Sequence, residues 1–535
     1  MTERAAKRCL LVFPEFTAAS FWNYRAACEL MGARYPAAPL GLITVAALLP
    51  ESWECRLVDC NVDRLRDGDI EWADIVFVGG MISQQRSSVS LIAKLKARGK
   101  IVVVGGADAT ASPHLYDAAD SLVLGEAEVT LPRWLADYEA GCAAHLYPAS
   151  EERAEMRNSP IPRFDLLDFG RYLHVGVQYT RGCPFNCEFC DIIELFGRVP
   201  RPKEPEQLIA ELDALYALGY RGHVDFVDDN FIGKKKEAKR LLPLLREWQE
   251  AHGWPFEFST EASINLADDD ELLRLMQGAG FFAVFVGVET PDLDTLVSAQ
   301  KRQNTRRSLA DSLRKIYAHG MFVNSGYIIG FDTDPPDISQ RMLQLIETSD
   351  VPVNMVGLLF ALPGTQLTRR LRREGRLGAG FDVAPDGSGD QCSAGLNFQT
   401  RRPRAEILRH YRRVLAESYS PKAYLGRVLR VGAAMNCSGK RLALPWRTRV
   451  RELRGFARLV WQMGFCAPYW PRFWLTLTGL LWRNPRSVRY SVALMALYLH
   501  LGEFARDLVR RLDAEISLSE LRELPEAVAA AASPA

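Results

Sequence analysis

Three cysteines close together in the chain have the spacing of an iron–sulfur ligand set. Cys183, Cys187 and Cys190 form a C-x3-C-x2-C pattern directly after the apolar run 175–179. Three thiolates can bind three irons of a [4Fe–4S] cluster and leave the fourth iron without a protein ligand. Because an iron with an open position can bind a small molecule, this spacing predicts a reactive centre and not only an electron carrier.

Two other interpretations of these cysteines are a structural zinc site and unrelated thiols of the protein core. Zinc usually takes four ligands in paired spacing, and His174 is the one nearby candidate for a fourth ligand. Unrelated core thiols would rarely fall at this spacing with an aromatic residue, Phe189, next to the last one. The iron–sulfur interpretation is therefore preferred.

The residues that follow the cysteines alternate between apolar strands and helices, a framework that can hold the loop. Strands are expected at about 174–180, 223–228, 256–261, 283–289, 322–330 and 354–361. Six such units predict a partial barrel of parallel strands, whose reactive side chains gather at the C-terminal ends of the strands. Carboxylate and amide oxygens can accept hydrogen bonds from ammonium and hydroxyl groups there. The candidates are Asp228, Asp229, Glu261, Glu289 and Asn324.

Residues 1–140 have the pattern of a separate, doubly wound parallel sheet. Short apolar strands are expected at 9–13, 55–58, 75–78 and 101–104, with helices such as 41–49 and 90–97 between them. Ligands of such sheets bind beyond the carboxyl ends of the strands, where glycines permit close approach of the backbone. The candidate residues at these ends are Asp59, Asn61, Gly79, Gly80, Gly105, Gly106, Gly125 and Glu126.

The cysteine loop 181–191 (RGCPFNCEFCD), the order of the polar strand ends and the G-x-I-x-G pattern at 326–330 resemble the radical S-adenosylmethionine (SAM) enzymes. In that family the open iron binds the amino and carboxylate groups of SAM, whose cleavage gives a 5′-deoxyadenosyl radical. The resemblance implies that Asp228 and Asp229 lie near the SAM amino group and Glu261 near the ribose hydroxyls. It also implies a position near the SAM carboxylate or the substrate for Glu289, with Asn324 as a further SAM-side candidate.

The first 140 residues, with PLGL at 39–42 and LGE at 124–126, are similar to the cobalamin-binding domain that precedes the radical SAM core in one large subfamily. Mutase-type domains carry D-x-H-x-x-G, whose histidine binds cobalt from below. The matching residues 59–64 read DCNVDR, with Asn61 in place of the histidine. This departure implies a cobalt that carries methyl groups rather than one that homolyses a cobalt–adenosyl bond. A degenerate flavodoxin-like domain with purely structural glycines is the alternative.

The C-terminal part of the chain is basic and rich in tryptophan. Residues 401–500 carry 20 Lys and Arg against 3 Asp and Glu, although the net charge of the whole chain is only +1. Apolar helices edged by Arg and Trp suit contact with anionic lipid, here through 440–510, and an ordinary helical cap on the barrel is the alternative. No nucleic acid partner is expected, because no recognised binding module accompanies the charge.

The cysteine content and the distribution of apolar residues indicate the class of protein and its location in the cell. Eleven irregularly spaced cysteines do not form a secreted disulfide framework, residues 1–8 do not look like a signal peptide, and no apolar run approaches about 18 residues. We therefore expect a cytoplasmic protein with peripheral contact to the inner face of the membrane. The expected divisions are a cobalamin-binding-like domain (1–140), a connector (141–172), a radical SAM core (173–380), a helical extension (381–525) and a disordered tail (526–535).

Together these features resemble cobalamin-dependent radical SAM proteins with a helical C-terminal extension, whose relatives include hopanoid C-2 methylases. The resemblance implies a [4Fe–4S] cluster, SAM and cobalamin as cofactors. It also implies transfer of a methyl group to an unactivated carbon of a lipid-like or other small molecule, with a reductase or flavodoxin-type protein as electron donor. A cyclase or rearrangement enzyme with the same cofactors and a non-catalytic sensor or scaffold are the alternatives. A methylthiotransferase would need a second cysteine cluster, which the sequence lacks.

Overall fold

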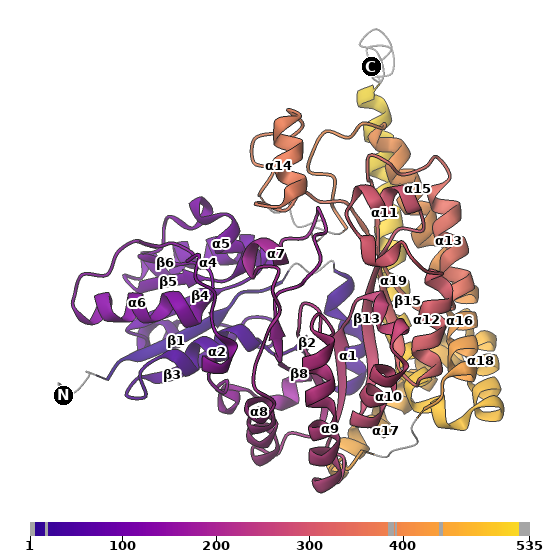
Figure 1. Cartoon of the computed structure of the whole chain (residues 1–535), viewed down its shortest axis with the longest axis horizontal. Coiled ribbons are helices and arrows are strands. Elements are labelled where there is room, and N and C mark those ends of the chain that lie inside the picture. Colours follow the sequence, from indigo (N-terminus) through magenta and orange to yellow (C-terminus); the bar gives the residue numbers. More distant parts are fainter. Residues whose placement is uncertain (1–5, 17–19, 384–389, 391–392, 438–441, 524–535) are drawn as a thin grey trace.

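The computed structural model describes residues 6–16, 20–383, 390, 393–437 and 442–523, and the predicted disordered tail 526–535 lies outside these residues. A parallel sheet from the first part of the chain lies beside a second parallel sheet, which helices cover on its far side (Figure 1). The expected α/β class, with a doubly wound N-terminal sheet, a partial barrel and a helical C-terminal extension, is confirmed.

The first sheet has the strand order β3-β1-β4-β5-β6-β7, with all pairs parallel. Its two faces are both apolar: in β1, Leu10 and Val12 face one core cluster, and Cys9 and Leu11 face the other. Helices α3, α4 and α5 cover the first face, and α2 and α6 cover the second. The bounds are β1 (Arg8–Phe13), α2 (Leu40–Leu48), β3 (Glu54–Asp59), α3 (Asp67–Trp72), β4 (Ile75–Gly79), α4 (Gln85–Ala97), β5 (Ile101–Gly105), α5 (Ala107–Ala111), β6 (Ser121–Val123), α6 (Ala127–Glu139) and β7 (Leu146–Tyr147).

The second sheet has the order β15-β14-β13-β12-β11-β8-β2, again with all pairs parallel. Helices follow its strands as in a partial barrel, and a short antiparallel pair, β9 with β10, flanks the cysteine loop. The bounds are β8 (Tyr172–Val177), β9 (Thr180–Arg181), α7 (Ile192–Leu195), β10 (Arg201–Pro202), α8 (Pro205–Ala217), β11 (Gly222–Phe226), α9 (Lys235–Ala251), β12 (Phe256–Glu261), α10 (Asp270–Ala279), β13 (Phe281–Glu289), α11 (Leu293–Ser298), α12 (Leu309–Ala318), β14 (Phe322–Ile329), α13 (Ile338–Ser349), β15 (Val353–Leu358) and α14 (Gln366–Arg373).

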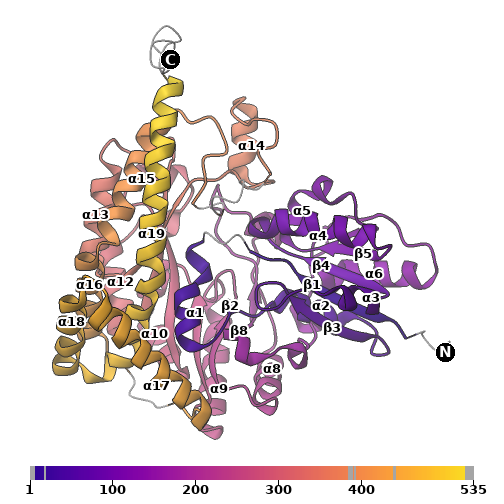
Figure 2. The ribbon, with the colours of Figure 1, turned by 180° about the vertical axis from the view of Figure 1, so that it is seen from behind.

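The six strands expected for the barrel are present, but a seventh comes from the N-terminal segment. Strand β2 (Tyr35–Ala37) pairs with β8 in the register Tyr35 to Tyr172, and the preceding helix α1 (Arg25–Met31) packs against C-terminal helices (Figure 2). Conversely, β7 lies in the expected connector (141–172) and adds a strand to the first sheet. Segments of the two sheets are therefore interleaved along the chain.

The C-terminal helices cover the barrel on the side away from the first sheet (Figure 2). Helix α15 packs on α13 and on the long α19, while α16 packs on α18 and α19. None of the helices within the described ranges is both long and apolar enough to cross a membrane. The bounds are α15 (Arg404–Ser418), α16 (Pro421–Ala434), α17 (Trp446–Trp461), a π-helical turn (Gln462–Cys466), α18 (Trp470–Arg483) and α19 (Val488–Glu523).

Candidate active site

The carboxyl ends of the first sheet and the inner face of the barrel line one cavity of about 1490 Å³. The first sheet contributes its glycine loops, the barrel contributes polar side chains, and α1, α17 and α19 contribute mostly apolar walls. Pockets for small ligands are usually about 300–1,000 Å³, so this cavity has room for more than one small molecule or for a large cofactor.

Most of the predicted cobalamin-binding residues line this cavity. They are Gly79, Gly80, Gly105, Gly106, Gly125 and Glu126.

Two of these glycines are also required by the packing of the backbone itself. Gly106 has φ +96°, and a Cβ there would lie 3.0 Å from the Gly80 carbonyl oxygen. A Cβ on Gly105 would lie 2.8 Å from the Val123 carbonyl oxygen. The fold alone thus explains these glycines. Because the glycines carry no side chains, the backbone itself forms this wall of the cavity, and such a wall fits a large flat cofactor such as cobalamin.

Asp59 and Asn61 are not among the residues that line the cavity. Asp59 is buried and accepts hydrogen bonds from the Tyr172 hydroxyl (2.9 Å) and from the Asn61 side chain (2.7 Å). The Asn61 amide also donates to the Pro14 carbonyl (3.1 Å) and accepts from the Phe16 N–H (2.9 Å). Both side chains hold the loop after β3 against the start of β8, and a cobalamin contact for them stays a prediction.

The predicted cobalamin residue Glu126 connects the first sheet to the cysteine loop. Its Oε2 accepts from Arg181 (2.8 Å) and from Arg201 (3.0 Å), and Glu128 pairs with the same Arg181 (2.9 Å). The Arg181 and Glu128 side chains are also largely buried. The other oxygen of Glu126 is buried and has no hydrogen-bond partner in the described chain, so it can still accept from a ligand.

The cysteine loop begins with a turn that two aspartates hold. Asp228 accepts from the backbone N–H groups of Tyr179 and Thr180 (both 2.8 Å), and Asp229 accepts from that of Gly182 (2.7 Å). Burial raises the pKa of Asp228 to about 7 and that of Asp229 to about 6. Neither lines the cavity. Both carboxylates position the loop, and their predicted contact with the SAM amino group stays a prediction.

The thiols of the loop receive amide donors and do not converge on one point. Asn230 Nδ2 lies 3.9 Å from Cys183 Sγ, and Gln303 Nε2 lies 3.7 Å from Cys187 Sγ. Across the described ranges, no three His, Cys, Asp or Glu side chains gather as ligands of a single metal ion. The cysteines of a [4Fe–4S] cluster each bind a separate iron, as three cysteines at C-x3-C-x2-C spacing can do. The donor set fits the cluster.

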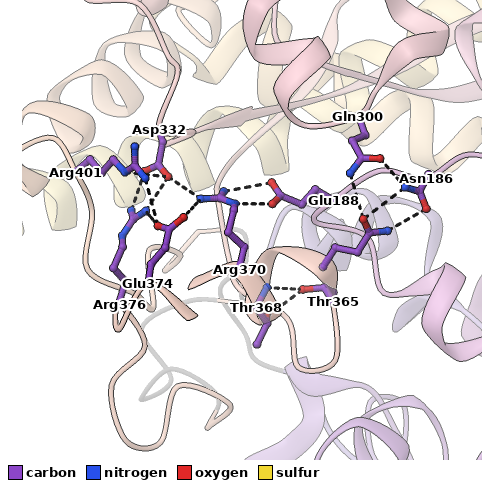
Figure 3. Close-up of polar contacts among 11 residues, drawn as sticks. Asn186, Glu188, Gln300, Asp332, Thr365, Thr368, Arg370, Glu374, Arg376 and Arg401 are labelled. Atoms are coloured by element: carbon purple, nitrogen blue, oxygen red, sulfur yellow. Dashed lines mark hydrogen bonds and ion pairs between the residues drawn. The ribbon is translucent and has the colours of Figure 1, made fainter. Parts of the chain in front are cut away.

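The outer side of the loop is fixed by polar side chains from distant segments (Figure 3). Arg370 on α14 donates to Glu188, between the second and third cysteines (2.6 and 3.2 Å), and to Asp332 (3.0 Å). Asn186 is held by the amides of Gln300 and Gln366 (2.5 and 3.0 Å). The loop is thus positioned by hydrogen bonds on both sides.

Two of the predicted SAM-side residues, Glu261 and Asn324, do line the cavity. Burial, with the nearby carboxylates of Asp225 and Asp229, raises the pKa of Glu261 to about 8. The Oδ1 of Asn324 is buried and has no hydrogen-bond partner among the described residues. Both groups are therefore available to a ligand's donors.

Glu289 is placed differently. It does not line the cavity, its backbone has φ +68°, and its carboxylate pairs with Lys301 (2.6 Å). A positive φ is costly for a residue with a side chain and is often found at functional sites. Lys301 also lies close enough to the thiols of Cys187 and Cys190 for its pKa to be raised by them as well as by Glu289.

Sequence reasoning missed a polar group on the barrel wall. His223 Nε2 lies 2.6 Å from Ser259 Oγ, which donates to Asp225, and all three side chains line the cavity. His174 lies beside His223, with ring centroids 4.9 Å apart, and its Nδ1 is buried without a partner in the described chain. Burial lowers the pKa of both histidines. The available signal was the alternation of polar residues along the expected strands.

Family models match three parts of the chain. A B12 binding domain matches residues 32–135, the radical SAM superfamily matches 177–346, and a domain of unknown function matches 365–514. The first match spans the glycine loops of the cavity and the second spans the cysteine loop and most of the barrel. The predicted cofactors, a cluster with SAM and cobalamin, are those of the matched domains.

Whole-length relatives lead to the same assignment. The chain is 42% identical to an uncharacterized methyltransferase of Synechocystis over 94% of this chain and 93% of that protein. It is 35% identical to the hopanoid C-2 methylase of Rhodopseudomonas palustris over 95% of both chains. Its fold is similar to that of the cobalamin-dependent SAM radical enzyme OxsB (TM-score 0.57, 16% identity, 95% of this chain and 81% of that one). It also resembles the radical SAM methyltransferase TsrM of Kitasatospora setae (TM-score 0.59, 14% identity, 90% and 99%). The chain belongs to the cobalamin-dependent radical SAM methyltransferases.

Proposed function

We propose that this enzyme methylates an unactivated carbon of a largely apolar, lipid-like small molecule. The observation that carries the proposal is the single cavity. It brings together the glycine wall of the first sheet, the polar residues of the barrel and an apolar wall from the C-terminal helices. When bound, cobalamin would supply the methyl carrier, and SAM at the cluster would supply the radical that activates the carbon.

Different residues of the cavity would bind SAM, bind the substrate and exclude water. Glu261 and Asn324, which line the cavity, offer oxygens to the amino and hydroxyl donors of SAM. His223 and Ser259 offer a polar anchor on the barrel wall to a hydroxyl of the substrate. The apolar walls exclude water from the cavity and match an apolar substrate. The apolar side chains are Phe456 and Leu459 of α17 and Val492, Ala496 and Leu497 of α19.

The position of Asn61 supports the methyl-carrier role of the cobalamin. It replaces the lower-ligand histidine of mutase-type domains, and its amide is occupied by Pro14, Phe16 and Asp59 instead of facing the cavity. A cobalt bound here would have no protein ligand from this position. The relative with the printed name hopanoid C-2 methylase supports a polycyclic lipid as the substrate class.

The proposal includes two partners, an electron donor and a membrane surface. The cleavage of SAM consumes one electron, so we include a reductase or flavodoxin-type donor in the proposal. We also include peripheral contact with the inner face of the cytoplasmic membrane through residues 440–510. Exposed tryptophans and arginines of α17 and α18 support this contact.

The test is anaerobic purification with cobalamin supplied, followed by metal analysis and assays with methyl-labelled SAM in detergent-solubilised lipid extracts. We expect about four irons and one cobalt per chain, and labelled methylated product. Replacing Cys183, Cys187 and Cys190 by Ala should remove the iron, whereas Cys142→Ala, at an exposed cysteine, should not. Four irons without cobalt would contradict the cobalamin mechanism. SAM cleavage without methylated product would favour the cyclase or rearrangement alternative.

A further inference from the structure

The outer face of α17 and α18 presents large apolar side chains to solvent. Trp461 is 65% exposed and Trp482 is 84% exposed. Trp461 contacts Phe465 in the π-helical turn, which contacts Trp474 of α18, with centroids 6.0 and 5.8 Å apart. The aromatic surface is therefore continuous between the two helices. The exposed apolar residues are Trp446, Leu453, Phe456, Trp461, Phe465, Trp470, Leu475, Leu481 and Trp482.

The charge around this surface is almost entirely positive. Between residues 442 and 502 the only acidic residue is Glu452, which pairs with Arg489 (3.4 Å). The arginines around the aromatic side chains are exposed and form no ion pair with any described residue. They are Arg447, Arg454, Arg472, Arg483 and Arg486. Aromatic side chains flanked by free arginines match the interface of a bilayer with anionic headgroups.

The same helix α17 that carries part of this surface also forms a wall of the cavity. Trp446, Leu453 and Trp461 lie seven and eight residues apart, about two turns each, and so share the outer face. Phe456 and Leu459 lie on the adjoining face and line the cavity. Leu453 and Phe456, which are 67% and 37% exposed, belong to both sets, whereas Leu459 is buried. An apolar path therefore runs from the outer surface over Leu453 into the cavity.

Polar contacts of α17 with the rest of the protein are few. Glu452 pairs with Arg489, and Arg458 donates to the Glu29 carbonyl (3.3 Å). At Gly455 the helix packs so closely on α1 that a Cβ would lie 3.1 Å from the Leu30 carbonyl oxygen. The helix is thus attached to α1 and to α19, while Trp446, Leu453 and Trp461 on its outer face are exposed.

We propose that α17 forms a lateral entrance through which an apolar substrate passes from an anionic bilayer into the cavity. This inference rests on the proposed lipid-like substrate and adds the route and the surface. The arginines bind the headgroups, the tryptophans insert at the interface, and Leu453 continues the apolar surface to Phe456 and Leu459. The substrate does not have to cross water.

The experiment uses the full-length protein as purified anaerobically with cobalamin supplied, whatever its metal content, and needs no turnover. The protein is mixed with vesicles of phosphatidylglycerol and phosphatidylcholine that contain a phospholipid with a photoreactive diazirine in its acyl chain. Sedimentation measures binding, and mass spectrometry maps the adducts. We expect binding to phosphatidylglycerol vesicles, and adducts both on the exposed Trp461 and on Leu459, which is buried and lines the cavity.

Three variants separate docking from entry. Trp461→Glu with Phe465→Glu should lower vesicle binding at least about tenfold, because each new carboxylate is repelled and costly at an anionic interface. Leu218→Glu, at an exposed leucine beyond α8, should leave binding unchanged. Leu453→Arg should keep vesicle binding but remove the adducts on Leu459, which is buried and lines the cavity. If Leu453→Arg lowers the melting temperature, Leu453→Gln replaces it.

The proposed entrance would be contradicted by wild-type protein that fails to bind anionic vesicles, or that binds them without labelling Leu459. Cavity adducts that persist in Leu453→Arg would also contradict it. These readouts are independent of metal content and of methylation in detergent. An entrance that fails would therefore leave the proposed function standing, and a failure of methylation would not alter the vesicle result.

Discussion

Acidic residues near neighbouring strand ends have different surroundings and so different uses. Asp228 and Asp229 accept hydrogen bonds from backbone N–H groups at the start of the cysteine loop, and Glu289 forms an ion pair with Lys301. Glu261 faces the cavity with a raised pKa. Of these four carboxylates, that of Glu261 is open to a ligand in the cavity, and its protonation state should depend on pH in the working range.

We predict that SAM affinity rises as pH increases through about 8 and that Glu261→Gln removes this rise. Below its raised pKa the Glu261 carboxyl is neutral, and above it the carboxylate is the stronger acceptor for the hydroxyl or amino donors of SAM. Loss of a hydrogen bond to a charged group costs about 1.5–3 kcal/mol, or about tenfold or more in affinity at high pH. Equilibrium binding of SAM between pH 6.5 and 9.5 to the cluster-loaded proteins measures the effect. An unchanged pH profile in Glu261→Gln would assign the dependence to another group.

At the scale of elements, the strand pair that precedes the cysteines is connected to the N-terminus of α6. Arg181 on β9 lies between Glu126 and Glu128, and Arg201 on β10 reaches the same Glu126. These side chains are largely buried, so each charge is stabilised by its oppositely charged partners and little by water. The first sheet and the cysteine loop are thus coupled by electrostatics as well as by packing.

We predict that Arg181→Ala lowers the free energy of unfolding by about 3–5 kcal/mol, because it leaves buried carboxylates without their cation. The matched control is Arg163→Ala, which removes the solvent-exposed pair with Asp165 and should cost about 1 kcal/mol or less. Denaturant unfolding followed by circular dichroism compares the variants at one pH. Equal effects of the two substitutions would mean that the Arg181 contacts add no more than a surface pair.

At the scale of the whole molecule, the two sheets do not correspond to two continuous parts of the chain. Helix α1 and strand β2 come from the first 40 residues but complete the barrel and contact the C-terminal helices. The cavity therefore has walls from the N-terminal, central and C-terminal segments. Removing one of these segments should therefore lower the stability of the parts that it contacts.

We predict that a fragment starting at residue 150 is folded poorly, because it exposes the backbone edge of β8 and the apolar surface that α1 covers. Joining residues 20–38 to this fragment through a flexible linker should restore much of the cooperative thermal unfolding. Near-ultraviolet circular dichroism and binding of a hydrophobic dye measure both fragments. Cooperative unfolding of the shorter fragment would show that the barrel does not need its seventh strand.

The sequence alone determined the features that depend on local order. The spacing of Cys183, Cys187 and Cys190 indicated the cluster, and the alternation of apolar strands and helices predicted both parallel sheets and the glycine loops at their ends. These properties follow from periodicity and from short loops, which neighbouring residues specify. The family assignment rests on the same segments.

Only the tertiary structure decided which of these residues meet. It joined β2 to β8, engaged Asp228 and Asp229 with the loop backbone, and placed Glu126 against Arg181. It also brought His223 and Ser259 together across neighbouring strands. Each of these contacts joins residues more than 30 positions apart, so its formation depends on sheet order and on packing of distant helices. No local pattern encodes such a pairing, because the competing partners differ only in where the folded chain places them.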